Sequence, residues 1–489
     1  IRQHGIYYGE LTNNYVIVGT KEEENDYTLP GTGQVAKTRY SGAGGVPIGS
    51  ALPRLAAGAR FKDFNIIIST IITKDSRILW NRNIALRARH IAPFLSFDQD
   101  PYIVVGEDGR LYWIQDAYTT SDMYPYSDRV RSGSDSFNYV RNSVKVVTDA
   151  YEGTVVFYVA DPDDPIVQTY QKIFPAIFKP MADMPAGLAN HLRYPEALFN
   201  AQSERLTIYH MTDPRVFYNR IEKWAIARER PKSAGQGGGF ASSGDSSEGE
   251  VMQAYYAIVR LPGESDPEYL LMLPFTPEGR PNMAAWLAAR CDPEHYGKLL
   301  VYNFPKTEQV WGPMQIEASI DQDTEISKDL SLWNQEGSVV TRGNLLVIPL
   351  DNSILYVEPI YLSAAQSRFP ELKRVIVARG DGKVAMAATL SQALADLLGG
   401  TPPKLAALEP SQMVPAPTEG GAPAPEPEEV VAPAPARAIP ADAYALAADA
   451  DRYFKEALER QREGDWAGYG ESLEKLQQTL SRLVEKTKP

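Results

Sequence analysis

The sequence contains almost no cysteine. Among its 489 residues there is one, Cys291, so a disulfide within the chain is excluded. Cys291 follows Met283, Trp286 and Leu287 at helical spacing, and free cysteine is usually buried, so we predict a small core residue. A nucleophilic cysteine would need a base beside it, and only His295 is close in the sequence.

Long apolar runs and excess positive charge are also absent. The longest strongly apolar run, Phe64 to Thr73, is only about half of the roughly 20 residues that span a bilayer. Lys and Arg total 49 against 62 Asp and Glu, a net charge of −13. An acidic chain without a basic stripe is a poor candidate for binding nucleic acid or anionic lipid. The chain begins at Ile1 without an initiator Met or a signal peptide, so we expect a processed or excised piece of a longer precursor.

Sequence signatures of catalysis are missing as well. There is no P-loop, dinucleotide fingerprint, zinc-type histidine pair or cysteine pair. None of the five histidines pairs at i, i+4 spacing. His210 is the best single candidate for a base, although a structural histidine is the more common case. The sequence discloses no chemical activity, and we favour a non-enzymatic role.

The patterns that are present predict an α+β fold with mostly antiparallel sheets and interspersed helices. Hairpins are expected at 102–114 and 144–159, and broken helices at 165–224. Further helices are predicted from Leu52 to Phe61, within 75–95, from Pro281 to Arg290 and from Leu390 to Leu398. Strands are predicted at 15–19, at Met314–Ile320 and in several runs between 255 and 387.

The composition divides the chain into three parts. Residues 1–400 form the α+β body, which could comprise two subdomains, 1–231 and 250–400, joined by a Gly/Ser loop at 232–249. Residues 401–440 are a Pro/Ala-rich extended linker, in which the tract Glu409 to Pro440 holds nine prolines. Such a tract becomes ordered only when something holds it along its length.

A helical hairpin is predicted at 441–489, with its second helix capped by Asp465. It is near the lower size limit for independent stability, so we expect it to dock onto its own body or onto a neighbouring molecule. Its candidate assembly residues share one apolar seam: Trp466, Tyr469, Leu473, Leu476, Leu480 and Leu483.

Three groups of carboxylates are candidate Ca²⁺ ligands, because alternate carboxylates in loops at strand ends can supply hard oxygen ligands. The groups are Asp98 and Asp100; Asp161, Asp163 and Asp164; and Asp321, Asp323 and Glu325. None matches the EF-hand pattern. Helix capping and turn formation are the common alternatives, and paired carboxylates could also serve glycoside hydrolysis.

An aromatic stretch interleaved with Asp, Ser and Thr is a candidate binding groove for glycan or peptide. It contains Tyr112, Trp113, Tyr118, Tyr124 and Tyr126. The alternative is an ordinary hairpin that continues into a well-packed loop.

Many short motifs resemble those of an uncharacterised family of bacterial multi-pass membrane proteins with a large extracytoplasmic C-terminal region. They cover most of residues 1–398 and include Ile6-Tyr-Tyr-Gly-Glu10, Asp75-Ser-Arg-Ile-Leu79, Ile91-Ala-Pro-Phe-Leu95, Tyr112-Trp-Ile-Gln-Asp-Ala-Tyr-Thr-Thr-Ser-Asp122, Tyr139-Val-Arg-Asn-Ser-Val-Lys145, Gly312-Pro-Met-Gln-Ile316 and Gly343-Asn-Leu-Leu-Val-Ile-Pro349. The resemblance implies a location at the bacterial cell surface or outside the cell, and a membrane-anchored precursor. It supplies no catalytic residues, and this chain lacks the family's several N-terminal membrane helices.

These observations favour an extracytoplasmic structural protein that is released from its precursor. We expect it to self-associate into a filament or ring through the linker and the hairpin. The alternatives are a cell-envelope glycan- or peptide-binding module, and an enzyme that processes envelope polymer or lipid with an Asp cluster. A stabilising Ca²⁺ is compatible with all three. Nucleic acid is not expected as a partner, and membrane contact is expected only through a precursor segment.

Overall fold

The structure is a computed structural model that describes residues 1–28, 34–132, 135–230, 249–305, 307, 309–334, 338–350, 353–364 and 369–400, and positions 452, 456, 460, 472, 475, 478 and 479. The chain divides into two compact units, Ile1–Leu405 and Ala406–Pro489. The predicted linker and nearly all of the Gly/Ser loop lie outside the described residues. So do the six candidate assembly residues, Trp466, Tyr469, Leu473, Leu476, Leu480 and Leu483.

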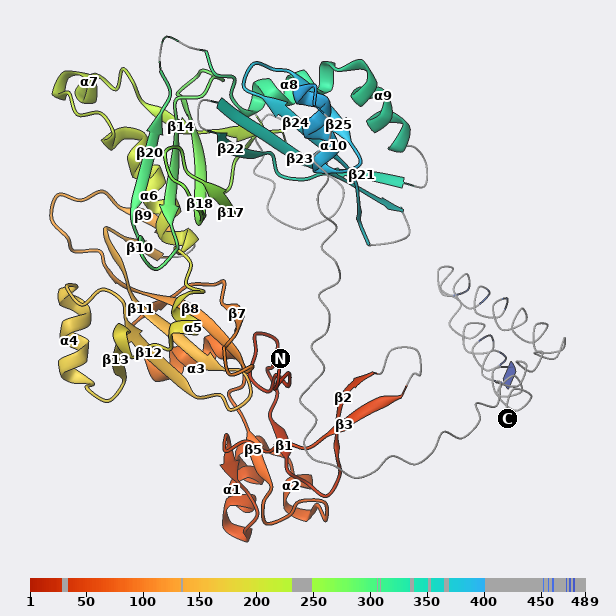
Figure 1. Ribbon diagram of the computed structural model, residues 1–489. Coiled ribbons are helices and arrows are strands. Elements are labelled where there is room, and N and C mark those ends of the chain that lie inside the picture. The colour runs from red at the N-terminus through yellow and green to blue at the C-terminus, as the bar shows by residue number, and fades with distance from the viewer. Residues whose placement is uncertain are drawn as a thin grey trace, which may run out of the picture. The chain divides into compact units, whose positions relative to one another are not determined.

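The first sheet has three antiparallel strands in the order β1–β5–β4, and two helices accompany it, while a third helix lies beside the second sheet (Figure 1). Ala57 of the first helix and Ile66 of the second are buried in one apolar cluster with Ile78 of β5. Asn83 caps the third helix by accepting a hydrogen bond from the Leu86 N–H. The elements are β1 Val16–Val18, β4 Val46–Pro47, β5 Arg77–Leu79, α1 Ala51–Phe61, α2 Asn65–Ile68 and α3 Ile84–Ile91, with a separate hairpin of β2 Glu24–Thr28 and β3 Val35–Thr38.

The second sheet has six strands and confirms the two predicted hairpins. Its order is β13–β12–β11–β8–β6, with β7 also paired to β8, and only the pairing of β12 with β13 is parallel. The turn between β11 and β12 needs Gly153, whose φ is +72° and which faces the ring of Tyr8. The strands are β6 Ser96–Phe97, β7 Tyr102–Val105, β8 Leu111–Ser121, β11 Tyr139–Asp149, β12 Val155–Val159 and β13 Phe178–Pro180, and the hairpin of β9 Val130–Ser132 and β10 Asp135–Phe137 lies between β8 and β11 in sequence.

Helices follow β12, as the proline-broken helical pattern predicts, and β13 lies between the first two of them. Asp164 and Asp213 cap two of them, each with a proline in the first turn. The helices are α4 Pro165–Ile173, α5 Ala186–Ala189, α6 Glu196–Tyr209 and α7 Pro214–Asn219, with a 3₁₀ turn at Met181–Asp183.

The third and fourth sheets share the largest apolar core, which includes Trp286, Tyr356 and Ile316. The third sheet has the order β14–β18–β19–β20 with β17 paired to β18, and the fourth has the order β21–β23–β24–β25 with β22 paired to β23. The strands are β14 Trp224–Ile226, β17 Tyr255–Arg260, β18 Pro267–Pro277, β19 Ala285–Arg290, β20 Leu299–Asn303, β21 Ser338–Arg342, β22 Leu346–Leu350, β23 Ser353–Ala364, β24 Glu371–Arg379 and β25 Val384–Ala387. A small hairpin, β15 Arg228–Glu229 with β16 Glu250–Val251, precedes β17. Three helices accompany the fourth sheet: α8 Pro313–Gln322, α9 Thr324–Trp333 and α10 Leu390–Leu398.

Two predicted elements near this core are wrong. The predicted helix Pro281–Arg290 is instead strand β19, whose six residues are all buried between β18 and β20. A short strand that is buried on both faces cannot be distinguished from a helix by apolar spacing alone. The predicted strand Met314–Ile320 lies in helix α8, where Pro313 occupies the first turn and Gln315 accepts the Gly312 N–H at 3.0 Å.

The prediction at 75–95 is correct only in part, because Ile78 and Leu79 belong to β5 and the helix begins at Ile84. The fold is nevertheless α+β with several mostly antiparallel sheets. In the described part of the chain, no helix combines the length and the apolar character needed to cross a bilayer.

Candidate functional site

A protruding loop between β8 and β9 carries the most exposed aromatic side chains in this region. We call residues 122–129 the aromatic loop. Tyr126 is fully exposed, while Met123 and Tyr124 are 85% and 55% exposed. Tyr126 also has a φ of +59°, a left-handed conformation that is uncommon for a residue with a side chain. The loop therefore presents three large side chains to solvent.

The side chain of Asn138 fastens the aromatic loop. Its Oδ1 accepts the Tyr124 N–H at 3.0 Å and its Nδ2 donates to the Tyr124 carbonyl at 2.7 Å. The Ser127 hydroxyl donates to the Asn138 carbonyl at 2.9 Å. The Tyr124 ring also stacks on Tyr139 at 5.7 Å. These bonds fasten the loop at Tyr124 and Ser127, on either side of Tyr126, so the exposed side chains project from a hydrogen-bonded backbone.

The other three predicted groove residues have structural roles in β8 and do not join the loop. Tyr112 donates to Asp108 at 2.7 Å, the Trp113 indole donates to the Tyr8 carbonyl at 2.9 Å, and the buried Tyr118 donates to Asp98 at 2.5 Å. The structure thus separates the predicted set into a hydrogen-bonded strand and an exposed pair, Tyr124 and Tyr126.

A buried ion pair lies in the middle of the same sheet. Lys145 of β11 and Asp116 of β8 are directly opposite across the strands. The Lys145 side chain has no exposed surface, and its ammonium donates to Asp116 and to the Tyr296 hydroxyl. Tyr296 in turn donates to the Arg193 carbonyl at 3.2 Å. Because the pair is almost completely buried, we assign it a structural role.

A second charged cluster surrounds Arg342 at the end of β21. Its guanidinium donates to Glu317 of α8, to both carboxylate oxygens of Glu358 in β23, and to Asp321 at 2.9 Å. Arg230 also donates to Asp321. These five residues line a cavity of about 390 Å³, together with Ser327, Leu330, Ser331, Asn334, Val340 and Gly343.

The two glutamates of this cluster are held away from water. Burial, with the nearby charge of Glu358, raises the pKa of Glu317 to about 8, and Arg342 opposes this rise. Burial likewise raises the pKa of Glu358. Because the two carboxyls are buried close to each other, we expect the pair to hold a proton near neutral pH.

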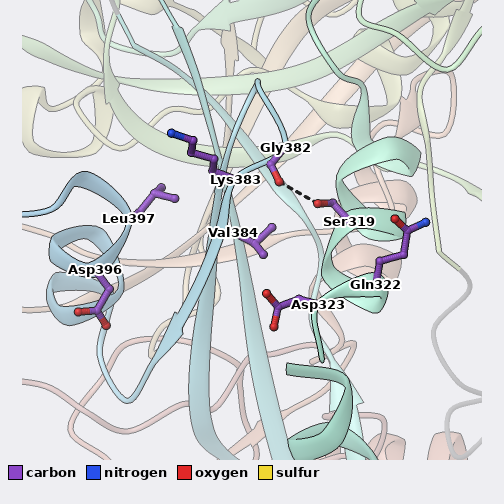
Figure 2. A pocket seen from close by; sticks show the side chains of 8 residues that line it. All are labelled: Ser319, Gln322, Asp323, Gly382, Lys383, Val384, Asp396 and Leu397. Carbon is purple, nitrogen blue, oxygen red and sulfur yellow. Dashed lines mark hydrogen bonds between the residues drawn. The ribbon is translucent and has the colours of Figure 1, made fainter. Parts of the chain in front are cut away.

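A more open cavity of about 480 Å³ lies on the other side of the α8–α9 corner (Figure 2). Its lining residues come from α8, from the β24–β25 turn and from α10: Ser319, Gln322, Asp323, Gly382, Lys383, Val384, Asp396 and Leu397. Ser319 donates to the Gly382 carbonyl at 2.8 Å and so joins the helix to the turn. Asp323, Lys383 and Asp396 give the lining of this cavity both signs of charge.

The predicted Ca²⁺ ligands are mostly occupied by contacts with the protein itself. Asp98 bonds Tyr118, Asp100 pairs with Arg193 at 2.6 Å, and Asp161 pairs with Arg141 at 3.0 Å. Asp163 donates its N–H to Asp161 at 3.2 Å, while the exposed Glu325 donates its N–H to Asp323. Within the residues that the structure describes, no three His, Cys, Asp or Glu side chains form a group that could hold a metal ion.

Asp164 and Asp323 are helix caps. Burial would raise the pKa of Asp164, but hydrogen bonds from Ser143, Thr119 and Tyr139 hold it below its ordinary value. Asp323 accepts the N–H groups of Glu325 and Ile326 at the start of α9. Helix capping, the alternative to metal binding, therefore explains the positions of both Asp164 and Asp323.

The candidate base and nucleophile are also in structural positions. His210 stacks on Trp224 at 3.6 Å, and its two ring nitrogens lie 2.8 and 3.1 Å from the carbonyls of Leu206 and Glu222. Cys291 is buried, as predicted, and burial raises the pKa of its thiol to about 11. His295 contacts Glu268 at 3.0 Å.

The sequence reading missed Lys145, Asp116, Glu317, Glu358 and Arg342. A signal was present for three of them, since Lys145, Asp116 and Glu358 are charged residues inside apolar strand runs. Buried charges of this kind are normally paired. The identity of each partner required the strand register.

The comparisons with known proteins agree on one family. A model of the uncharacterised protein family UPF0182 matches residues 1–333. A UPF0182 protein of Moorella thermoacetica is 48% identical over 99% of this chain and 49% of its own length. A UPF0182 protein of Desulforamulus reducens is 47% identical over 99% of this chain and 48% of its own length.

A third relative, a UPF0182 protein of Geotalea uraniireducens, is 48% identical over 98% of this chain and 48% of its own length. The chain thus spans about half the length of the curated relatives it matches. No solved structure matches. Because the family model covers more than half of the chain and the relatives cover nearly all of it, the chain belongs to the uncharacterised protein family UPF0182.

Proposed function

We propose that this chain is the extracytoplasmic region of a longer, membrane-anchored bacterial protein and that it binds a protein partner through the aromatic loop. The first part is supported by the motif resemblance and by relatives about twice as long as the chain. The second part is carried by one observation: Met123, Tyr124 and Tyr126 are exposed on a loop whose backbone Asn138 fixes.

The composition of the aromatic loop fits a protein interface. Tyr and Met are enriched in interface cores, and tyrosines often contribute a large share of the binding energy. A loop that is already ordered loses little conformational freedom on binding. Polar groups surround the three side chains, with Asp128 paired to Arg205 at 3.3 Å. An apolar centre with a polar rim is the usual arrangement of such interfaces.

The test is retention of the purified chain on the envelope fraction of the producing cells. The double variant Tyr124→Ala, Tyr126→Ala should be retained at least about tenfold more weakly, since two aromatic anchors are lost. Tyr218→Ala is the matched control, because Tyr218 on α7 is 86% exposed outside the loop. Both variants should keep the circular dichroism spectrum of the parent.

Enzymatic digestion of the envelope fraction before the retention assay identifies the chemical class of the partner. Protease treatment should abolish retention if the partner is a protein. Retention that survives protease but is lost after digestion of the glycan would contradict the proposal and favour the glycan-binding alternative. Equal retention of the parent and the double variant would show that the loop is not the binding surface.

A second proposal is self-assembly through the helical hairpin predicted at 441–489, and it rests on the apolar seam in the sequence. Ser472 and Thr479 are buried by the chain itself, so they do not contribute a surface that is free for a second copy. Deletion of 441–489 should then reduce the molar mass measured by light scattering from that of an oligomer to that of one chain. An unchanged oligomeric state would contradict it.

A further inference from the structure

Residues 51–71, which contain α1 and α2, expose five large apolar side chains. We call Leu52, Leu55, Phe64, Ile68 and Ile71 the α1–α2 apolar surface. Leu52 is 79% exposed, Phe64 is 67% exposed and Ile68 is 58% exposed. Single exposed apolar residues are ordinary, but five within twenty residues are not.

The segment that carries these side chains is held firmly to the core. Ala57 and Ile66 are buried beneath it, and the Arg54 guanidinium donates to the Ile72 carbonyl at 3.1 Å. This bond ties the segment after α2 to the side of α1. Lys62 ends α1 in a left-handed conformation, with its N–H directed to the Gly58 carbonyl. The five apolar side chains are therefore exposed even though the segment that carries them is packed against the core.

The charge of this segment is opposite to that of the chain. Residues 51–74 contain four basic residues and one acidic residue, whereas the whole chain has a net charge of −13. Arg60, Lys62 and Lys74 are exposed. The single acidic residue, Asp63, accepts a hydrogen bond from Tyr15 at 2.5 Å. Cationic and apolar side chains thus occur together here.

We propose that the α1–α2 apolar surface docks onto an anionic lipid bilayer. Apolar side chains flanked by Lys and Arg are the combination that enters the headgroup region of such a membrane. A second copy of the chain is a poorer occupant, because a symmetric contact would bring the same positive charges together. The net negative charge of the chain makes general binding to anionic lipid unfavourable. The same charge means that an anionic bilayer repels the other faces of the protein, so that this surface would face the bilayer.

The experiment is flotation of the full 489-residue chain with vesicles. Binding is expected to vesicles that combine phosphatidylcholine with phosphatidylglycerol, to weaken on pure phosphatidylcholine and to fall as salt is raised. Lys62→Gln should weaken binding about fivefold, because one positive charge leaves the surface. Ile68→Ser should also weaken it, since an apolar contact is lost.

Matched controls keep the result specific to this surface. Lys373→Gln removes an exposed positive charge on β24, and Ile258→Ser removes an isoleucine that is 72% exposed on β17. Both should float like the parent, as should the aromatic-loop variant, so the two proposals fail independently. No flotation with anionic vesicles, or equal loss in the controls, would overturn the proposal. A dimer that Ile68→Ser disrupts, without vesicle binding by the parent, would assign the surface to a second copy instead.

Discussion

At the scale of single residues, Lys145 and Asp116 form the most strongly buried ion pair that the structure describes. Their side chains are 0% and 5% exposed. Removing two charges from water is costly, and their attraction repays the cost only when both partners remain. The pair therefore constrains the second sheet more than it stabilises it.

Replacing one partner should leave the other charge unpaired in the core. We expect Lys145→Met to lower the free energy of unfolding by about 3–5 kcal/mol, measured by urea denaturation. The double variant Lys145→Met, Asp116→Leu should recover much of this loss. Arg129→Met, in a pair whose partners are both mostly exposed, serves as the control and should change stability by less than about 1 kcal/mol. A single Lys145 variant as stable as the parent would refute this account.

The glutamates around Arg342 predict a pH dependence of stability. The pKa of Glu317 is raised from 4.5 to about 8 in the fold, so the folded state binds more protons than the unfolded state between these values. Its contribution to stability is complete below about pH 4.5 and is lost as the pH rises toward 8. The slope cannot exceed about 1.4 kcal/mol per pH unit for one group.

Urea denaturation between pH 5 and pH 8 measures this slope. Glu317→Gln should remain uncharged throughout and should lose less stability than the parent as the pH rises. Glu325→Gln on α9 is the control, because the Glu325 side chain is exposed. Parallel pH profiles for the parent and Glu317→Gln would contradict the assignment.

At the scale of elements, Asp164 connects a helix start to a sheet. It caps α4 through the N–H groups of Ile166 and Val167, and it also accepts the hydroxyls of Thr119 at 2.5 Å and Tyr139 at 2.7 Å. Asp164→Ala would leave these donors unpaired in a buried site, so we expect a loss of at least about 2 kcal/mol. Asp213→Ala removes an exposed cap from α7 and should cost only about 1 kcal/mol. Equal losses in guanidinium unfolding would show that the sheet contacts contribute nothing.

Local sequence signals decided which helices and strands could be predicted. The hairpins at β7–β8 and β11–β12 have tight turns with Gly109 and Gly153, both at positive φ, and alternation marks their strands. Helix α10 begins with the cap Thr389 and ends at Gly399. The prediction of strand β19 failed because a central strand has no polar face. The prediction for α8 failed because Met314, Ile316, Ala318 and Ile320 alternate with polar residues, a pattern that is also typical of a strand.

The candidate sites were harder to predict than the fold. Tyr124 and Tyr126 were predicted from the sequence as binding residues, but only the structure separates them from Tyr112 and Tyr118. Asp321 and Asp323 do line cavities, although at a helix corner and not at the end of a strand. An aspartate that caps a helix and one that binds a metal occur in similar local sequences. The Arg342 cluster depends on contacts between residues far apart in the chain.

At the scale of the whole molecule, the division after Leu405 makes a simple prediction. A chain of residues 1–405 contains every element whose bounds the structure gives. We expect it to fold alone and to melt within about 2 °C of the full chain in calorimetry, because the first unit keeps its own core. A much lower melting temperature would show that residues 406–489 stabilise the body.

One side chain sets the direction of the polypeptide at the corner between α8 and α9. Asp323 is both the C-cap of α8 and the N-cap of α9, so its carboxylate lies where the two helices meet. Without that break, residues 313–333 could continue as one rod of about 30 Å. Such a rod would carry Ser327, Leu330 and Ser331 of α9 away from Arg342, while Asp323 itself would leave the lining of the other cavity. A substitution at Asp323 would then remodel both cavities at once, although the residue contacts only two backbone amides at that bend.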